Sequence, residues 1–169
     1  AQINNSRDKN VTDLQMIGNA VPKYYASLAN NFTYKQFDLR VFLRGKFDYD
    51  ILNRNALSYA NKTWAGNLLT STFDKYSQIN DTYMYSDYYL ERGSYVKIDE
   101  VTLGYNFKFK TKLIRNMRIY ATGQNLATIT GYTGSDPDFI NDTGLGPSVD
   151  NSGAYPSTRS FLFGLNVGF

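Results

Sequence analysis

Asp136 and Asp138, two carboxylates separated by one residue, are the first candidates in this chain for a catalytic or metal-binding role. A pair of catalytic carboxylates needs a fixed separation. Both aspartates lie in one loop rich in Gly, Asp and Asn, so the sequence does not support a catalytic pair. An EF-hand calcium site also fails, because its fifth position is Ile140 and no suitably placed Gly or Glu follows. Two interpretations stay open: a looser calcium site that adds Asn141 and Asp142, and a turn formed by Asp-Pro chemistry.

The absent residue types restrict the chemistry further. The 169 residues include no cysteine and no histidine. Disulfide frameworks, thiol nucleophiles, the usual zinc sites and His-based triads are therefore excluded. The net charge of +3 is small and spread along the chain, so it gives no argument for nucleic-acid binding. We expect a protein that is not an enzyme, binds no nucleic acid and holds no cofactor other than the calcium just considered.

Aromatic side chains are the other candidates for binding. The chain contains 15 Tyr and 11 Phe. A polar segment carries a group of tyrosines that could stack on sugar rings or contact a partner, although packing of the loop against itself explains them equally well. These residues are Tyr83, Tyr85, Tyr88 and Tyr89. Tyr132, close to the two aspartates, joins them as a candidate ligand contact.

Alternation of apolar and polar residues provides the framework for these side chains. In the last twelve residues, Phe161, Phe163 and Phe169 fall on one parity, whereas Ser160 and Gly164 fall on the other. Successive side chains of a strand point to opposite faces, so this segment predicts a strand with one apolar face. About ten residues of tilted strand cover the ~25 Å apolar band of an outer-membrane barrel. The same pattern predicts strands at about 23–34, 37–47, 95–109, 116–129 and 158–169.

Two strands carry further information. In 95–109 the apolar face changes parity around Asp99 and Glu100, and one extra residue there predicts a β-bulge. In 37–47, Arg40, Arg44 and Lys46 share a face. They form either a basic track along a lumen or ordinary wall residues that pair with opposite charges on neighbouring strands.

The connections alternate in length. Links at 35–36 and 110–115 are short, whereas the loops at about 48–94 and 130–157 are long, and the first of these loops could hold a short amphipathic helix. Outer-membrane barrels place short turns in the periplasm and long loops outside the cell. The C-terminus then lies on the periplasmic side. Five strands do not close a barrel, so we expect the rest of the barrel to come from more of the same protein or from another chain.

Four passages in order resemble the C-terminal end of the SusC/RagA family of TonB-dependent transporters of Bacteroidetes. They are MIGNAVPKYYASLANNFTYKQFDLRVFLRG (16–45), GSYVKIDEVTLGYNF (93–107), RIYATGQNLATITGYTGSDPD (118–138) and YPSTRSFLFGLNVGF (155–169). The end of the chain also resembles the signal read by the barrel assembly machinery. Gly164, Val167 and Phe169 match that signal, whereas Leu162 departs from it.

The resemblance implies an all-β membrane barrel of 22 strands, of which this chain supplies the last five antiparallel strands. The plug domain and the TonB box would lie outside these residues. It implies an outer-membrane importer of oligosaccharides or peptides that is energised through TonB, works with a SusD-like lipoprotein lid, and is surrounded by lipid and lipopolysaccharide. The tyrosines and aspartates above would then be ligand or lid contacts.

Two alternatives remain at this stage. The chain could be a small outer-membrane barrel protein completed by oligomerisation. It could also be a soluble β-sandwich that binds carbohydrate with the same aromatic residues, because the alternation in 37–47 also suits a half-exposed soluble sheet.

Overall fold

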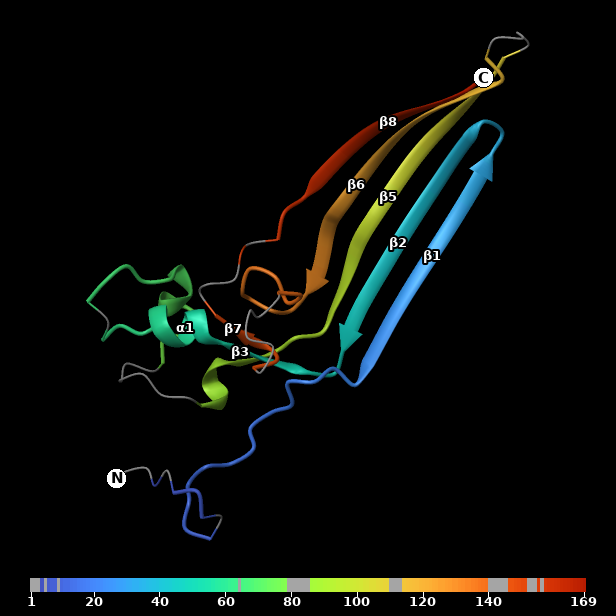
Figure 1. Cartoon of the computed structure of the whole chain (residues 1–169). Helices are drawn as coiled ribbons and strands as arrows, with labels where there is room; N and C mark the ends of the chain where they lie inside the picture. The colour runs from blue at the N-terminus through green and yellow to red at the C-terminus, as the bar shows by residue number, and fades with distance from the viewer. Residues whose placement is uncertain are drawn as a thin grey trace.

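The computed structural model describes residues 4, 6–8, 10–63, 65–78, 86–109, 114–139, 146–151, 155 and 157–169. A long five-stranded sheet forms one part of the molecule, and a smaller unit lies beyond one end of it (Figure 1). The strands of the large sheet are antiparallel neighbours in the order β1-β2-β5-β6-β8. Their bounds are Tyr24–Tyr34 for β1, Phe37–Phe47 for β2, Tyr95–Lys108 for β5, Asn116–Thr130 for β6 and Ser160–Gly168 for β8.

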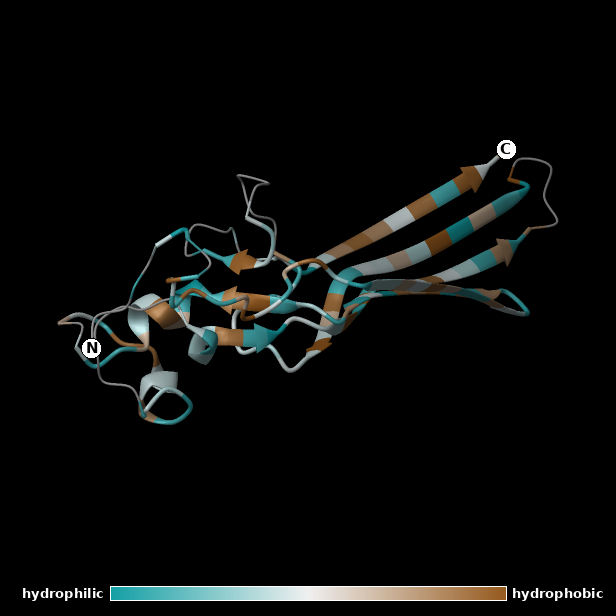
Figure 2. Cartoon of the chain, turned by 90° about the horizontal axis from the view of Figure 1, so that it is seen from below, coloured by the Kyte–Doolittle hydropathy of each residue, from teal (hydrophilic) through white to brown (hydrophobic). Residues whose placement is uncertain are grey.

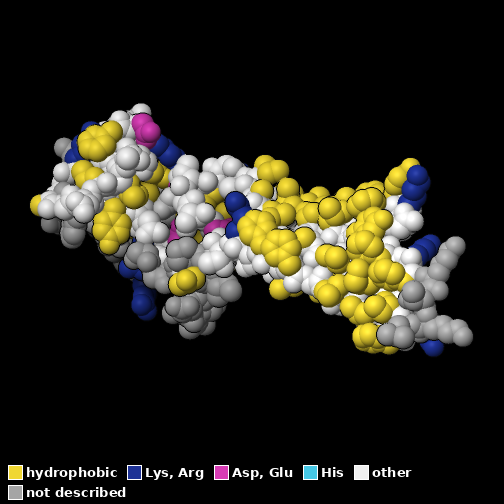
Figure 3. Space-filling model, turned by 90° about the horizontal axis from the view of Figure 1, so that it is seen from above, with side chains coloured by type: hydrophobic (Ala, Val, Ile, Leu, Met, Phe, Trp, Pro, Cys, Tyr) yellow, Lys and Arg dark blue, Asp and Glu magenta, His cyan; other side chains and the backbone are white. Residues whose placement is uncertain are grey.

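The large sheet has one apolar face and one polar face, as the alternation predicts. The paired residues of one row across the five strands are all apolar: Phe32, Leu39, Leu103, Ala121 and Phe163. The adjacent row, which points to the other face, is mainly polar: Asn31, Arg40, Thr102, Thr122 and Leu162. Bands of alternating hydropathy mark the strands in Figure 2, and hydrophobic side chains gather along the sheet in Figure 3.

The apolar face is open to its surroundings. Phe163 is 80% exposed and Phe32 is 56% exposed. A sheet in water would bury such side chains, whereas the outer wall of a membrane barrel presents them to lipid. No helix in the described part of the chain is long and apolar enough to cross a membrane.

Two local irregularities were predicted and are confirmed. The register of β5 shifts between Ile98 and Glu100 against both of its neighbours, which places a β-bulge at Asp99. The hairpin between β1 and β2 turns at Lys35, whose φ of 55° lies in the left-handed region that suits a tight turn. The bulge keeps the apolar residues of β5 on one face along its whole length.

The smaller unit is more ordered than the sequence suggests. The predicted short helix is present as α1, Arg54–Tyr59, and the 3-10 turns η1, Thr70–Phe73, and η2, Asp87–Tyr89, follow it. A three-stranded sheet of order β4-β3-β7 was not expected from the sequence. Its strands β3, Asp50–Asn53, β4, Leu90–Arg92, and β7, Val149–Asp150, are too short for alternation to reveal them.

The two long loops together form this smaller unit, which we call the loop unit (the described residues of 49–94 and 131–151, namely 49–63, 65–78, 86–94, 131–139 and 146–151). Strand β3 of the first loop pairs in parallel with β7 of the second. A core packs around α1 from Ala56, Leu57, Ala60, Tyr76 and Tyr89. A second core joins both loops through Tyr49, Ile51 and Tyr132, with Phe139 packed against it. Two loops that are far apart in sequence therefore share one packed structure.

Candidate functional site

The candidate site lies where the loop unit meets the polar face of the large sheet. The chain leaves β6 at Thr130, and side chains of the loop 131–139 contact β2 and β5. The carboxylates singled out in the sequence, Asp136 and Asp138, lie in this loop. Both side chains point to cations that rise from the strands.

Asp138 is the centre of the site. Its carboxylate accepts hydrogen bonds from Lys46 Nζ at 2.9 Å and Tyr95 Oη at 2.6 Å, and Arg44 Nη2 lies 2.7 Å away. Burial alone would raise the pKa of Asp138, but the bonds from Lys46, Tyr95 and Arg44 outweigh burial and lower the pKa to about 2. The carboxylate is therefore ionised at neutral pH and held by three donors.

Asp136 and Pro137 add two further contacts to the strands. Lys97 Nζ lies 2.9 Å from Asp136 Oδ2, and both side chains are more than nine-tenths buried. Tyr49 Oη donates a hydrogen bond of 3.1 Å to the carbonyl oxygen of Pro137. The sequence Asp-Pro-Asp therefore fastens the loop to the wall, and we call this set of contacts the clasp (Asp136–Asp138 with Arg44, Lys46, Tyr49, Tyr95 and Lys97).

The charges of this region balance. Asp99, the bulged residue of β5, accepts from Arg44 Nε at 2.8 Å and adds a third carboxylate. Three cations then face three anions: Arg44, Lys46 and Lys97 against Asp99, Asp136 and Asp138. Arg40, the other member of the basic face, is 57% exposed and lies 3.6 Å from Glu100. Arg40 and Arg44 pair with carboxylates of the neighbouring strand β5, which confirms that part of the interpretation as wall residues. Lys46 pairs instead with Asp138 of the loop, and the three residues form no open basic track among the described residues.

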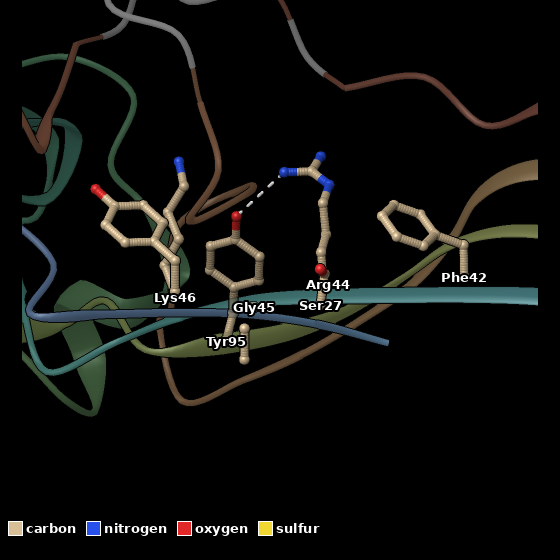
Figure 4. Close-up of a pocket in the computed structure, with 8 residues that line it drawn as sticks. Ser27, Phe42, Arg44, Gly45, Lys46 and Tyr95 are labelled. Carbon is tan, nitrogen blue, oxygen red and sulfur yellow. Dashed lines mark hydrogen bonds between the residues drawn. The ribbon is translucent and has the colours of Figure 1, made fainter. Parts of the chain in front are cut away.

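A pocket of about 250 Å³ opens on the polar face beside the clasp. Phe42, Arg44 and Lys46 of β2 and Tyr95 of β5 rise from the same side of the sheet to line it (Figure 4). Arg44 Nη1 donates a long hydrogen bond of 3.4 Å to Tyr95 Oη. Tyr25, Ala26, Ser27 and Gly45 complete the lining.

A second polar centre, Glu91 of β4, stabilises the loop unit itself. Its carboxylate accepts hydrogen bonds from Tyr76 Oη at 2.6 Å, Asn53 Nδ2 at 2.9 Å and the Thr133 hydroxyl at 2.7 Å, and Lys75 Nζ lies 2.9 Å away. Burial raises the pKa of Glu91, but these donors outweigh burial and lower it to about 2. Because Thr133 belongs to the second loop, Glu91 connects the two loops.

We expect the Glu91 network to weaken only in acid. A carboxylate with a lowered pKa stabilises the fold above its ordinary pKa of 4.5, and this contribution is lost as the pH falls towards 2. The shift corresponds to about 3 kcal/mol of loop-unit stability. Pepsin should therefore cleave the loop unit of the full-length protein much faster at pH 2 than at pH 4.

The variant Glu91→Gln provides the comparison for this experiment, because a neutral amide cannot titrate. Its loop unit should be cleaved rapidly at both pH values. Asp87→Asn, which changes an exposed carboxylate of the same segment, is the matched control and should behave like the unmodified protein. A pH profile shared by the Glu91 variant and the unmodified protein would contradict the role given to Glu91.

The structure places the predicted tyrosines in different environments. Tyr89 and Tyr132 are 3% and 6% exposed, and the Tyr132 hydroxyl donates to Asp150. Tyr88 is half-buried and packs edge-on against Tyr76 and Tyr89, whereas Tyr83 and Tyr85 lie outside the described residues. Their assignment as ligand or lid contacts stays a prediction, and the observed contacts of Tyr89 and Tyr132 lie within the loop unit.

The other predicted site residues are placed as follows. No group of three His, Cys, Asp or Glu side chains in the described part of the chain could hold a metal ion. Asn141 and Asp142 lie outside the described residues, so the loop calcium stays a prediction. Gly164, Val167 and Phe169 lie on or at the end of β8, at the edge of the sheet, and their role as an assembly signal also stays a prediction.

Several residues of these centres were not identified from the sequence, among them Tyr49, Glu91, Tyr95 and Lys97. Tyr95 and Lys97 share a parity with each other and oppose Val96 and Ile98, so the alternation that predicts the bulge also places them on the polar face. That signal could have added them to Arg44 and Lys46. Glu91 lies on a strand of three residues, and no sequence pattern marks it.

Comparisons with known proteins agree with this geometry. No protein-family model matches the chain. The chain is 29% identical over 188 residues to the TonB-dependent receptor P3 of Formosa agariphila, with all of the chain and 18% of the relative covered. It is 30% identical over 154 residues to the TonB-dependent receptor SusC of Bacteroides thetaiotaomicron, with 84% of the chain and 15% of the relative covered. The chain thus spans less than a fifth of these relatives.

Solved structures share the fold. The RagAB peptide transporter matches with a TM-score of 0.67 and 17% identity, over 89% of the chain and 17% of that structure's chain. The closed-closed state of the RagAB peptide importer matches with a TM-score of 0.66 and 14% identity, over 99% and 21%. These proteins are receptors and transporters rather than enzymes, which fits the expectation for this chain. The five strands are part of a barrel wall, and the chain is a segment of a SusC/RagA-type TonB-dependent transporter of the bacterial outer membrane.

Proposed function

We propose that the protein containing this chain imports nutrients across the outer membrane, with oligosaccharides or peptides as its cargo and TonB as its source of energy. The observation that carries the proposal is the large sheet, whose apolar face is exposed while its opposite face is polar and charge-balanced. A wall of this kind separates lipid from an aqueous lumen. The names of the sequence relatives and of the solved structures support the same function.

In this proposal the chain contributes structure. The large sheet supplies lipid-facing wall, which contacts lipid and lipopolysaccharide on its apolar face, and its edge strands pair with the remainder of the barrel. The loop unit lies at the end of the sheet opposite the short hairpin of β1 and β2, which is the extracellular end if short turns are periplasmic. A SusD-like surface lipoprotein would contact this end, and TonB would act through a part of the protein outside these residues.

Deletion of the gene in the source bacterium tests the import function. We expect the mutant to lose growth on one oligosaccharide or one peptide mixture while its growth on the constituent monomers is unchanged. A mutant that lacks TonB should show the same loss, and the restored gene should reverse the first defect. Undiminished growth of the deletion mutant on every oligomer that supports the parent strain would contradict the proposal.

The partner is tested separately. Affinity purification of the full-length protein from outer membranes solubilised in detergent should recover a surface lipoprotein in about equal amount. A preparation that contains only the transporter at low detergent, under conditions that keep the barrel folded, would contradict the assignment of a lipoprotein partner.

A further inference from the structure

The pocket beside the clasp has aromatic rings at both of its ends. Tyr25 of β1 is 67% exposed, and it pairs with Lys46, so its ring lies on the polar face. Phe42 is the one apolar residue among the polar-face positions of β2, which are Asp38, Arg40, Phe42, Arg44 and Lys46. Lipid contact explains neither ring, because both lie on the face that bears the ion pairs.

The two rings lie along the strand direction. Phe42 pairs with Ala29, which is four residues along β1 from Tyr25. At ~3.3 Å per residue, the backbone positions that carry the two rings are about 13 Å apart along the strand direction. Arg44 and Ser27 face each other between them. The pocket is thus a short track that runs down the wall from the end that bears the loop unit (Figure 4).

The positive and negative charges around the track cancel, but some N–H donors of its cations remain unused. The three cations nearest to the track are balanced by Asp99, Asp136 and Asp138. The guanidinium of Arg44 and the ammonium of Lys46 nevertheless carry more N–H donors than their contacts with the described residues use. The hydroxyls of Ser27 and Tyr25 add groups that both donate and accept.

We propose that this track binds sugar units of a neutral, extended oligosaccharide on its way through the lumen. The inference rests on the proposed import function and specifies one cargo class and its contact residues. The C–H faces of sugar rings pack on Tyr25 and Phe42, and sugar hydroxyls accept hydrogen bonds from Arg44 and Lys46. An anionic ligand is disfavoured because the cations are already paired, and the clasp would have to open to release them.

A peptide would use the same donors through its carbonyl groups, but the two exposed rings would then be needed only for apolar side chains. Another part of the same protein could also cover the track, because most of the length of its relatives lies outside this chain. Both alternatives are outcomes of the experiment below rather than parts of the proposal.

The test is binding to the full-length protein in detergent, measured by calorimetry. The probes are uncharged hexaoses of glucose, mannose and xylose, and an uncharged hexapeptide of Gly, Ser and Asn. We expect one of the hexaoses to bind, and Tyr25→Ala and Phe42→Ala each to weaken that binding about tenfold. Tyr25→Phe should retain most of the affinity, because the ring is preserved.

The control is Tyr24→Ala, which removes a neighbouring ring of similar exposure from the opposite, lipid-facing side. It should leave binding unchanged.

The proposal is overturned if no hexaose binds, if only the hexapeptide responds to the two ring variants, or if those variants lower the thermal stability of the empty protein without changing affinity. The last result would assign the track to a contact inside the protein. The growth experiment tests import, and the binding experiment tests the track. A negative result in one does not change the result of the other, so failure of the import function and failure of the sugar-binding track can be distinguished.

Discussion

Replacing Asp138 by Ala is expected to release loop 131–139 from the wall. The change removes the acceptor of Lys46 and Tyr95 and one of the two carboxylates paired with Arg44. Removing one partner of a buried ion pair typically costs 3–5 kcal/mol, because the remaining groups stay desolvated without a partner. Arg44 and Lys46 are each about one-third exposed, so we expect the lower end of this range, about 3 kcal/mol.

Hydrogen–deuterium exchange of the full-length protein measures this effect locally. Amides of segment 131–139 should lose protection by about two orders of magnitude, whereas amides in the middle of β2 and β5 should keep theirs. Asp48→Asn is the matched control, because Asp48 forms an ion pair with Lys23 that is exposed on both sides. Unchanged exchange in the Asp138 variant would mean that the loop is held by its apolar contacts alone.

The long strands could be predicted because alternation over ten or more residues is a strong signal. The bulge at Asp99 followed from the same signal, since a change of parity within one strand requires an extra residue. The hairpin at Lys35 followed from the two strands that it joins. These features depend on residues that are close together in sequence.

The loop unit could not be predicted because its contacts are not local. Strand β7 has two residues and pairs in parallel with β3, almost a hundred positions earlier in the chain. Tyr89 and Tyr132 were expected as ligand or lid contacts. Tyr89 is buried by residues of the first loop that lie up to 33 positions earlier in the chain, and Tyr132 is buried by packing between the two loops. A tyrosine in a polar segment has the same sequence signal whether its ring is covered or exposed.

The clasp could be predicted only in part. Asp136, Asp138, Arg44 and Lys46 were all singled out from the sequence, but as separate hypotheses about a loop and a strand face. Their pairing depends on the return path of the loop after β6, which no pattern in the sequence fixes. Residue type therefore identified the participants, and only the fold identified their partners.

The second large effect is expected at the end of the chain. Val167→Ala combined with Phe169→Ala should lower the yield of folded protein in the outer membrane more than any loop substitution, by at least tenfold. Phe169 is 80% exposed, and among the strands that the structure describes β8 pairs with β6 alone. Loss of these side chains therefore removes little packing within the large sheet, and a strong defect would arise during assembly. The yield is measured by heat-dependent migration of outer-membrane protein in gels, and Tyr155→Ala, at an exposed loop residue, is the control.

Gly164, the third residue of the predicted assembly signal, also packs against β6, so variants at this position distinguish a defect of packing from a defect of assembly. A Cβ at this position would overlap the far end of the Tyr120 ring on β6, so Gly164→Val should displace that ring and lower the yield to the extent that the ring cannot move aside. Combining it with Tyr120→Ala removes the ring and should restore the yield. No second change in the wall should rescue the Val167 and Phe169 variant in this way, because its defect lies outside the packed sheet. If Tyr120→Ala also rescued the variant Val167→Ala with Phe169→Ala, the end of β8 would act through packing. If that variant had the same yield as the unmodified protein, a role of these residues in assembly would be refuted.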